Sequence, residues 1–365
     1  MLKSISNCLY QLIQRNSKYE NSNLNCYKMK NSTFFQKLTF LMVSVILFAS
    51  CTDETDKPVF PISATIFHSV KDKQVAFTAL THSAVSWSWD FGDGQTSTEQ
   101  NPVHVYAKGG YYNAVLTATD QAGTTAKDTV ELALALEPIN YLTGNPNSPG
   151  YKGKTWRLTK NHSPKDNFCN PDLTFTPMDP KIPSLPAGAF GTYLGIPEIY
   201  DDEFTFYYDG SYRHDVKSDG GSMAGLVYAS VMAQIGQTTI LKKSGKAVFG
   251  ADILATATYT PVTTAKFVFK ENEDFTTTTL PKFATGVVGG VPVITYPKSM
   301  TIDFPNSTEF MGIMDFQRKV LVQEINDNSM RVAMFVTLDP AAIVSTNPLV
   351  TLSTTAMVLT FEVVK

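Results

Sequence analysis

Two groups of acidic residues lie close enough together in the sequence to bind a metal ion or to act as catalytic carboxylates. Asp90 and Asp93 flank a Phe-Gly pair in the stretch WDFGDG, and the acidic run Asp201–Glu203 lies more than a hundred residues further on. Carboxylate oxygens bind calcium when several of them converge, and two carboxylates that face a sugar about 5–10 Å apart can hydrolyse a glycosidic bond. Each group is therefore either a reactive site or part of the hydrogen bonding of the fold.

We expect the first group to be structural. The glycines around Asp93 tolerate positive φ, and a carboxylate beside such a turn accepts hydrogen bonds from neighbouring backbone N–H groups. Calcium binding by Asp90 and Asp93 is the alternative, and it needs further oxygen ligands that the sequence does not show. We therefore assign one structural motif to six consecutive residues: Trp89, Asp90, Phe91, Gly92, Asp93 and Gly94.

The second group is expected to mark a solvated strand entry, with calcium binding as the next option. Neighbours in a strand point to opposite faces, so Asp202 and Glu203 cannot be the facing pair of a glycosidase from regular strand positions. The five histidines form no spaced set of the zinc type, and Cys169 lacks a nucleophile signature. We therefore expect no enzyme, no catalytic residue, no metal and no cofactor, with calcium as the open alternative.

Tyrosines are concentrated between Tyr193 and Tyr212, around the same acidic run. A tyrosine combines a broad apolar body with a polar tip, which suits contact with a sugar ring. Alternation in the stretch EFTFYYDG turns its phenylalanines to the core and Tyr207 to solvent. If the chain binds a glycan, we expect Tyr207 and then Tyr200 to contact it, with Asp201 and Asp202 accepting its hydroxyls. Packing in the core is the alternative role for each tyrosine.

Strands joined by short turns position these residues. In the segment 59–136, alternating apolar residues in KQVAFTAL, VSWSWDF and GGYYNAVLTATD have the period of half-buried strands, and turn residues separate them. This spacing predicts an antiparallel sandwich. Residues 137–153 hold three prolines and three glycines and are expected to form a linker.

From residue 154 to residue 365 the pattern is again that of strands. The stretch DDEFTFYYDGSYRHDVK predicts a hairpin, and AMVLTFEVV predicts a closing strand. The segment Gly220–Gln237 is rich in small and apolar residues and predicts a short helix with Ser222 as its N-cap. By elimination among β architectures, we expect a larger antiparallel β-sandwich of the jelly-roll type, and an all-β fold for the chain.

Composition and charge agree with such a chain. Of 365 residues, 43% are hydrophobic and 17% are charged, which allows a sizeable core. Residues 1–50 hold six Lys or Arg and one acid, so the remainder, with 24 basic and 32 acidic residues, carries a net charge of −8. No arginine cluster stands out, which argues against nucleic acid as a partner.

Residues 1–50 have the pattern of an export leader sequence. The apolar run Leu38–Phe48 follows a basic start and is too short to cross a membrane, and two small residues precede Cys51. This junction resembles the lipobox of bacterial lipoproteins, which implies a signal peptide, lipidation of Cys51 and anchoring in the outer membrane. An ordinary cleaved signal peptide is the alternative, and Met29 is an alternative start.

Residues 51–58 form an acidic tether after that cysteine. Its sequence TDETD resembles the surface-export signal of Bacteroidota lipoproteins, which implies a location at the cell surface. A solvated tether without such a role is the alternative.

The ordered set of WDFGDG, NPVHVY and GGYYNAVLTATD resembles the PKD domain, over residues 59–136. The resemblance implies an immunoglobulin-like sandwich that serves as a spacer or interaction module. More loosely, KTWRL, YDDEFTFYYDGSY and MVLTFEVV resemble the C-terminal region of PKD-containing surface lipoproteins of Bacteroidota. Those proteins often belong to glycan-uptake systems and resemble carbohydrate-binding modules.

Together these features predict a non-catalytic, membrane-anchored surface lipoprotein that binds a glycan through its C-terminal domain. An adhesion or scaffold protein with a protein partner is the first alternative, and a glycoside hydrolase is the second. An exposed aromatic platform beside polar groups would favour glycan binding. A flat surface would favour the scaffold, and a deep cleft with two facing carboxylates would favour the enzyme.

Overall fold

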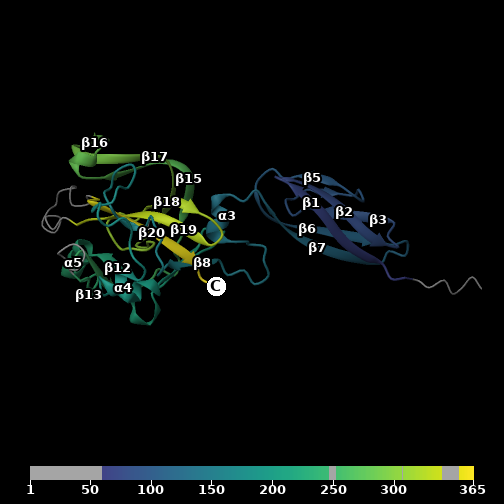
Figure 1. Ribbon diagram of the computed structural model, residues 1–365. Helices are drawn as coiled ribbons and strands as arrows, with labels where there is room; N and C mark the ends of the chain where they lie inside the picture. The colour runs from purple at the N-terminus through teal and green to yellow at the C-terminus, as the bar shows by residue number, and fades with distance from the viewer. Residues whose placement is uncertain (1–59, 246–251, 306, 339–352) are drawn as a thin grey trace, which may run out of the picture. The chain divides into compact units, whose positions relative to one another are not determined.

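The computed structural model describes residues 60–245, 252–305, 307–338 and 353–365 of the chain (Figure 1). Antiparallel strands make up most of the regular secondary structure of this part, and its helices are few and short, which confirms the all-β fold class. Cys51, the leader before it and the acidic tether lie outside the described residues. Within these described ranges, no helix is long and apolar enough to cross a membrane.

Residues 60–136 form two antiparallel sheets, which we call the N-terminal sandwich. One sheet has the order β1–β2–β5, with β1 (Ser63–Lys71), β2 (Gln74–His82) and β5 (Val103–Val105). The other has the order β4–β3–β6–β7, with β4 (Thr96–Ser97), β3 (Ser86–Asp90), β6 (Gly110–Thr119) and β7 (Thr125–Leu134). Alternate side chains of β2 and of the second half of β6 are buried, as the sequence pattern predicts.

Aromatic rings form the core of the N-terminal sandwich. Trp89 is fully buried, its ring centroid lies 5.1 Å from that of Phe77, and its indole N–H donates to the Glu99 carbonyl at 2.9 Å. Tyr106 is also fully buried, and its hydroxyl donates to the Phe91 carbonyl at 3.0 Å. The large rings supply the buried apolar area, and their polar tips are satisfied by backbone groups.

Residues 137–365, which we call the C-terminal domain, contain a large antiparallel sheet. Its order is β11–β10–β8–β20–β19–β18–β17–β15, while β9 pairs with β20 and β16 pairs with β17. Because β8 and β20 are direct neighbours, the two ends of the domain's sequence meet inside the sheet. The bounds of the strands are β8 (Lys154–Leu158), β9 (Asn167–Cys169), β10 (Glu203–Phe206), β11 (Tyr212–Asp215), β15 (Val268–Thr278), β16 (Gly286–Val288), β17 (Val291–Asp303), β18 (Val320–Ile325), β19 (Ser329–Val336) and β20 (Thr355–Val363).

A smaller sheet has the order β12–β14–β13, with β12 (Gly221–Gly225), β14 (Leu254–Thr258) and β13 (Ile240–Lys243). The helix predicted within the segment 220–237 is α5 (Leu226–Gln234), which packs beside this sheet (Figure 1). Ser222 is not its N-cap, because Ser222 lies in β12 and donates its hydroxyl to the buried Asp202 at 2.6 Å. Short helical turns connect other strands: α4 (Ala189–Thr192), η1 (Pro197–Tyr200), η2 (Lys217–Asp219) and η3 (Pro281–Phe283).

The segment predicted as a linker contains the short helix α3 (Pro138–Thr143). A capping box begins it, in which the Asn140 side chain accepts a hydrogen bond from the Glu137 N–H at 2.9 Å. Leu142 is fully buried in the core of the C-terminal domain, and its carbonyl accepts the indole N–H of Trp156 at 3.0 Å. The C-terminal domain therefore begins earlier than the proline and glycine content indicates.

Candidate binding cleft

The structure separates the four residues that were predicted to bind a glycan. Tyr200 and Asp202 are buried, at 2% and 3% exposure, whereas Asp201 is exposed and Tyr207 is half-buried. The ring of Tyr207 packs edge-on against that of Tyr151, with centroids 6.5 Å apart. Strand alternation could not place Tyr200, because it lies in the turn η1 before β10 begins. The expectation that Tyr200 and Asp202 are accessible to a sugar is therefore corrected.

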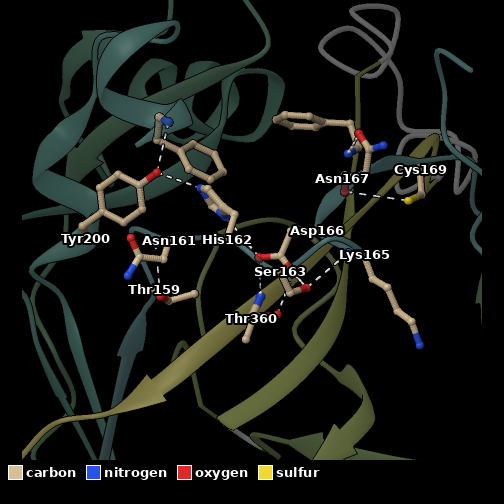
Figure 2. Close-up of polar contacts among 12 residues, drawn as sticks. Thr159, Asn161, His162, Ser163, Lys165, Asp166, Asn167, Cys169, Tyr200 and Thr360 are labelled. Carbon is tan, nitrogen blue, oxygen red and sulfur yellow. Dashed lines mark hydrogen bonds and ion pairs between the residues drawn. The ribbon is translucent and has the colours of Figure 1, made fainter. Parts of the chain in front are cut away.

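Tyr200 belongs to a buried polar network (Figure 2). Its hydroxyl lies 2.8 Å from Nε2 of His162, and Nδ1 of His162 lies 3.1 Å from Oδ2 of Asp166. Asp166 also accepts hydrogen bonds from the hydroxyls of Ser163 and Thr360 and from the backbone N–H of Thr360. Burial would raise the pKa of Asp166, but these hydrogen bonds outweigh it and lower the pKa. The network ties the segment after β8 to β20, which is a structural role.

Asp202 belongs to a second buried cluster, centred on His214. Oδ2 of Asp202 lies 3.9 Å from Nε2 of His214, and Oε2 of Glu309 lies 3.6 Å from its Nδ1. Burial alone would lower the pKa of His214, but the two carboxylates raise it. Burial raises the pKa of Asp202. Aromatic rings pack against the imidazole on more than one side, so neither carboxylate faces an open surface.

A cavity of about 390 Å³, which we call the cleft, opens between α5, the segments next to β13 and β14, and the segment that joins β17 to β18. Its volume falls within the range of about 300–1,000 Å³ that small-molecule sites occupy. Two methionines, Met232 and Met314, form part of its wall. The other lining residues carry rings, hydroxyls, an amide or a charge: Tyr228, Tyr259, Gln237, Thr238, Thr258, Thr260, Thr308 and Arg318.

Helix α5 and the chain that follows it build one wall of the cleft. Tyr228 and Met232 are four residues apart in α5, so they lie on one face of the helix. Gly236 follows the helix with a φ of +70°, which a residue with a side chain adopts only at a cost. The chain then turns so that the Thr238 hydroxyl donates to the Thr258 carbonyl at 2.6 Å. This contact brings the beginning of β13 and the end of β14 to the same edge of the cleft.

The segment between β17 and β18 builds the opposite wall. Met314 exchanges two backbone hydrogen bonds with β12, at 2.8 and 3.0 Å, which fixes the segment to the smaller sheet. Further along, Arg318 donates to the Tyr228 hydroxyl at 2.7 Å and to the Thr308 carbonyl at 3.0 Å. Its guanidinium carbon lies 5.1 Å from the centroid of the Tyr228 ring. Residues ninety positions apart in the sequence thus meet directly in the cleft.

Tyr259 connects the cleft to the buried cluster around His214. Its ring lies 5.5 Å from that of His214 and 4.9 Å from that of Phe310. Burial, helped by the charge of Glu309, raises the pKa of Tyr259. Its hydroxyl is buried and makes no hydrogen bond of ordinary geometry to the described residues. Because an unpaired buried hydroxyl costs free energy, a polar group that reached it from the cleft would be stabilised there.

The described residues around the cleft offer binding groups and no constellation for hydrolysis. Among the residues that line it, Arg318 is the single charged side chain, so no pair of carboxylates faces the cavity. A second cavity of about 280 Å³ is lined mainly by apolar side chains such as Phe168 and Leu185. No cluster of three metal-ligating side chains occurs in the part of the chain that the structure describes. Burial raises the pKa of the Cys169 thiol to about 12, which keeps it protonated.

The carboxylates of the WDFGDG motif are directed at the protein's own groups. Oδ1 of Asp90 accepts the N–H of Gly92 at 2.9 Å, and Oδ1 of Asp93 accepts the N–H two residues further on at 3.0 Å. Oδ2 of Asp93 lies 2.8 Å from Nε2 of His104. Gly92 and Gly94 adopt φ values of +78° and +85°. These contacts describe a tight turn whose side chains hold its backbone.

The cleft could not be predicted from the sequence, because its lining residues come from segments that lie far apart in the chain and share no sequence pattern. The segment Gly220–Gln237 was recognised as a helix, and Tyr228 within it was the available signal for one wall. The opposite wall comes from the connection between β17 and β18, whose sequence has no strand period and no motif. Only the fold brings Arg318 to Tyr228.

Comparisons with known proteins identify the N-terminal sandwich. Residues 58–134 match the model of the PKD domain family, so this part of the chain is a PKD domain. Collagenase ColA of Bacillus cereus is 36% identical over 101 residues, which cover 27% of this chain and 10% of that protein. Pre-pro-metalloprotease PrtV of Vibrio cholerae is 45% identical over 58 residues, which cover 16% of this chain and 6% of that protein. The chain thus spans a tenth or less of these relatives.

Two solved structures align with this chain at low TM-scores. The PKD1 domain of Vibrio anguillarum Epp aligns with 29% identity and a TM-score of 0.21, covering 21% of this chain and 98% of that domain. A structure described as a carbohydrate-binding module of the β-sandwich superfamily covers 83% of this chain and 91% of its own, with 12% identity and a TM-score of 0.22. Both TM-scores are too low to support an argument about function.

Proposed function

We propose that this protein is a non-catalytic binding protein that holds a saccharide in the cleft of its C-terminal domain. The observation that carries the proposal is the lining of the cleft. Two tyrosines offer rings with polar tips, beside one amide and four threonine hydroxyls that can exchange hydrogen bonds with sugar hydroxyls. A mainly apolar ligand would leave without a partner those polar groups that the protein does not already pair, such as the Tyr259 hydroxyl, which costs free energy.

The position of the buried acids favours binding over hydrolysis. A glycosidase needs two carboxylates on either side of a sugar, about 5–10 Å apart. In this domain Asp202 and Glu309 lie on either side of an imidazole instead, within 3.9 and 3.6 Å of its nitrogens. The similarity to collagenase ColA and to PrtV is confined to the PKD region, which supports an accessory role for that domain as a spacer.

The proposal includes a lipid anchor at Cys51 that holds the protein on the outer membrane, facing the cell surface. The support is the leader sequence and its junction with Cys51. Several acyl chains on one cysteine would bind a membrane essentially permanently, because each buried methylene contributes about 0.8 kcal/mol.

Replacement of the anchoring cysteine tests this part of the proposal. We expect Cys51→Ala to abolish labelling by a fatty-acid analogue and to move the protein from the membrane fraction to the soluble fraction. Cys169→Ala, which removes a buried thiol, is the matched control and should retain the label. Unchanged labelling of the Cys51→Ala protein would contradict the anchor.

A scaffold or adhesion protein with a protein partner is the second candidate. It is favoured by the outward face of the β1–β2–β5 sheet in the PKD domain. Four apolar side chains share that face and are each more than half exposed: Phe67, Leu80, Val103 and Val105. Such a row of exposed apolar groups is a feature of interaction surfaces.

A glycan-array screen of the full chain separates the two candidates. The proposed function predicts that at least one saccharide binds and that the PKD domain alone binds none of them. It also predicts that incubation with the selected saccharide releases no shorter product. If the full chain bound no saccharide on the array, glycan binding would be rejected in favour of the scaffold.

A further inference from the structure

Arg318 gives the cleft a single positive charge. It is half-buried and is the one charged side chain among the described residues that line the cavity. Its guanidinium carbon lies 5.1 Å from the ring centroid of Tyr228 and 5.6 Å from that of Phe310. Attraction between the cation and the two rings holds the group in place, so its orientation is set before any ligand arrives.

Within the part of the chain that the structure describes, this charge has no ion-pair partner. No carboxylate of the described residues lies within 4.0 Å of a guanidinium nitrogen of Arg318. The nearby Asp315 accepts hydrogen bonds from the backbone N–H groups of Phe316 and Thr337, and it is buried. Burial raises the pKa of Asp315 to about 7, against the smaller opposing effect of Arg318. Arg318 therefore makes no ion pair with the described residues, and the hydrogen bonds of Asp315 are made to backbone N–H groups instead.

The guanidinium also keeps donors for a ligand. It has five N–H groups in a planar fork, and its bonds to Tyr228 and Thr308 are the two that the described residues accept from it. A planar fork matches the oxygens of a carboxylate or sulfate, and such charge-assisted hydrogen bonds are about twice as strong as neutral ones.

We propose that the saccharide held in the cleft is acidic, and that its carboxylate or sulfate group binds the Arg318 guanidinium. This inference rests on the proposed function and names the class of its ligand. The hydroxyls and the amide around the cavity would then bind the neutral part of the same sugar. Both kinds of anionic oxygen group share this chemistry, and the choice of probes distinguishes them.

Titration calorimetry of the full chain with four probes tests the proposal. The probes are a galacturonic acid tetrasaccharide, the same tetrasaccharide fully methyl-esterified, a sulfated galactose tetrasaccharide and its unsulfated counterpart. We expect at least one acidic probe to bind tenfold or more tighter than its neutral counterpart. Preference for the uronate identifies a carboxylate ligand, and preference for the sulfated probe identifies a sulfate ligand.

Variants of Arg318 connect this preference to the guanidinium. Arg318→Gln should reduce the ratio of acidic to neutral affinity to about one, whereas Arg318→Lys keeps the charge without the fork and should retain part of the ratio. Arg157→Gln, which makes the same change at an arginine paired with Glu362 outside the cleft, should leave the ratio unchanged. Melting curves of each variant show whether it is folded. If Arg318→Gln fails to fold, the ratio of acidic to neutral affinity is compared between the wild type and Arg318→Lys. An equal ratio in these two proteins would then contradict binding of the acidic group by the guanidinium.

Two results overturn the inference, and they can be told apart. If neutral probes bind as tightly as acidic ones in the wild type, Arg318 only holds the two walls of the cleft together, and glycan binding itself survives. If neither these probes nor any saccharide of the array binds, the proposed function fails and the inference fails with it.

Discussion

The carboxylates of the WDFGDG turn in the PKD domain and the buried carboxylates of the C-terminal domain accept hydrogen bonds over very different distances in the sequence. Asp90 accepts the N–H of the residue two positions further on, and Asp93 does the same. In the C-terminal domain, Asp166 accepts hydrogen bonds from Thr360, 194 residues away. Asp202 accepts one from Ser222, 20 residues away. Asp90 and Asp93 are thus organised by a short motif, and Asp166 and Asp202 by the packing of segments that are distant in the sequence.

The two kinds of carboxylate should differ in their effect on stability. Asp90 of the PKD domain holds the backbone of its own turn, so its loss affects a local feature. In the C-terminal domain a carboxylate joins segments that come together only in the folded state, and the cleft is assembled in the same way. We therefore expect substitutions of the second kind to have the larger effects.

The largest effect is expected for Asp166→Ala. This change leaves His162 and the Thr360 N–H without their partner in a fully buried site. Breaking a buried pair by removal of one partner costs about 3–5 kcal/mol. Urea denaturation of the C-terminal domain should show a loss of that size. Asp172→Ala, which removes a partly exposed carboxylate bonded to residues two and four positions away, is the matched control and should cost about 1 kcal/mol.

Equal losses for the two variants would contradict the comparison. The pH dependence gives a second check, because the pKa of Asp166 is lowered in the folded state. Its contribution is present above the unfolded pKa of an aspartate, about 4, and is lost as the pH falls through the lower folded value. The free energy of unfolding should therefore decrease in acid more steeply for the wild type than for Asp166→Ala. Equal decreases for the two proteins would also contradict the comparison.

Asp315 should show the opposite pH dependence. Burial raises its pKa to about 7, so the folded protein holds this proton more tightly than the unfolded chain. The free energy of unfolding should therefore fall as the pH rises from about 4 to about 7, with a slope of at most about 1.4 kcal/mol per pH unit. Asp315→Asn removes this titration and should flatten the curve in that window. Urea denaturation at several pH values measures this slope. Identical slopes for the wild type and Asp315→Asn would contradict the raised pKa of Asp315.

In the PKD domain, two glycines of one turn offer a matched pair. A Cβ on Gly92 would lie 2.6 Å from the backbone oxygen of Asn113, whereas a Cβ on Gly94 would meet nothing within 4 Å. Both have positive φ, which costs a residue with a side chain about 1 kcal/mol or more. We expect Gly92→Ala to destabilise the domain by about 3 kcal/mol and Gly94→Ala by about 1 kcal/mol. Calorimetric melting measures both, and a larger loss at Gly94 would show that the turn is described incorrectly.

The fold could be predicted from the sequence as far as local pattern determines it. Alternation identified the buried faces of strands in both domains, including Phe204 and Phe206 in β10. The PKD motif was specific because its residues stand close together in a fixed order. The C-terminal domain begins before residue 154, because Leu142 is buried in its core. Proline and glycine content cannot predict such a tertiary contact.

The site was less predictable for the same physical reason. The concentration of tyrosines predicted an exposed binding surface. Tyr200 is buried instead, and its hydroxyl is hydrogen-bonded to His162, which lies 38 residues away in the sequence. The cleft combines α5 with the segment between β17 and β18, and no periodicity links them. A sequence can report which side of a strand is apolar, whereas it cannot report which distant loop will face a helix.

We propose that the cleft, and not the surface around Tyr207, binds the saccharide. Calorimetry with the saccharide that the array selects distinguishes the two locations, using Tyr228→Ala and Tyr207→Ala as a matched pair. Tyr228→Phe is included because it keeps the ring and removes only the hydroxyl that Arg318 contacts.

We predict about a tenfold loss of affinity for Tyr228→Ala, equivalent to about 1.4 kcal/mol, a smaller loss for Tyr228→Phe, and wild-type affinity for Tyr207→Ala. The same melting temperature for the three variants and the wild type would show that the fold is intact. A folded Tyr228→Ala protein that binds like the wild type, while Tyr207→Ala loses affinity, would contradict binding in the cleft.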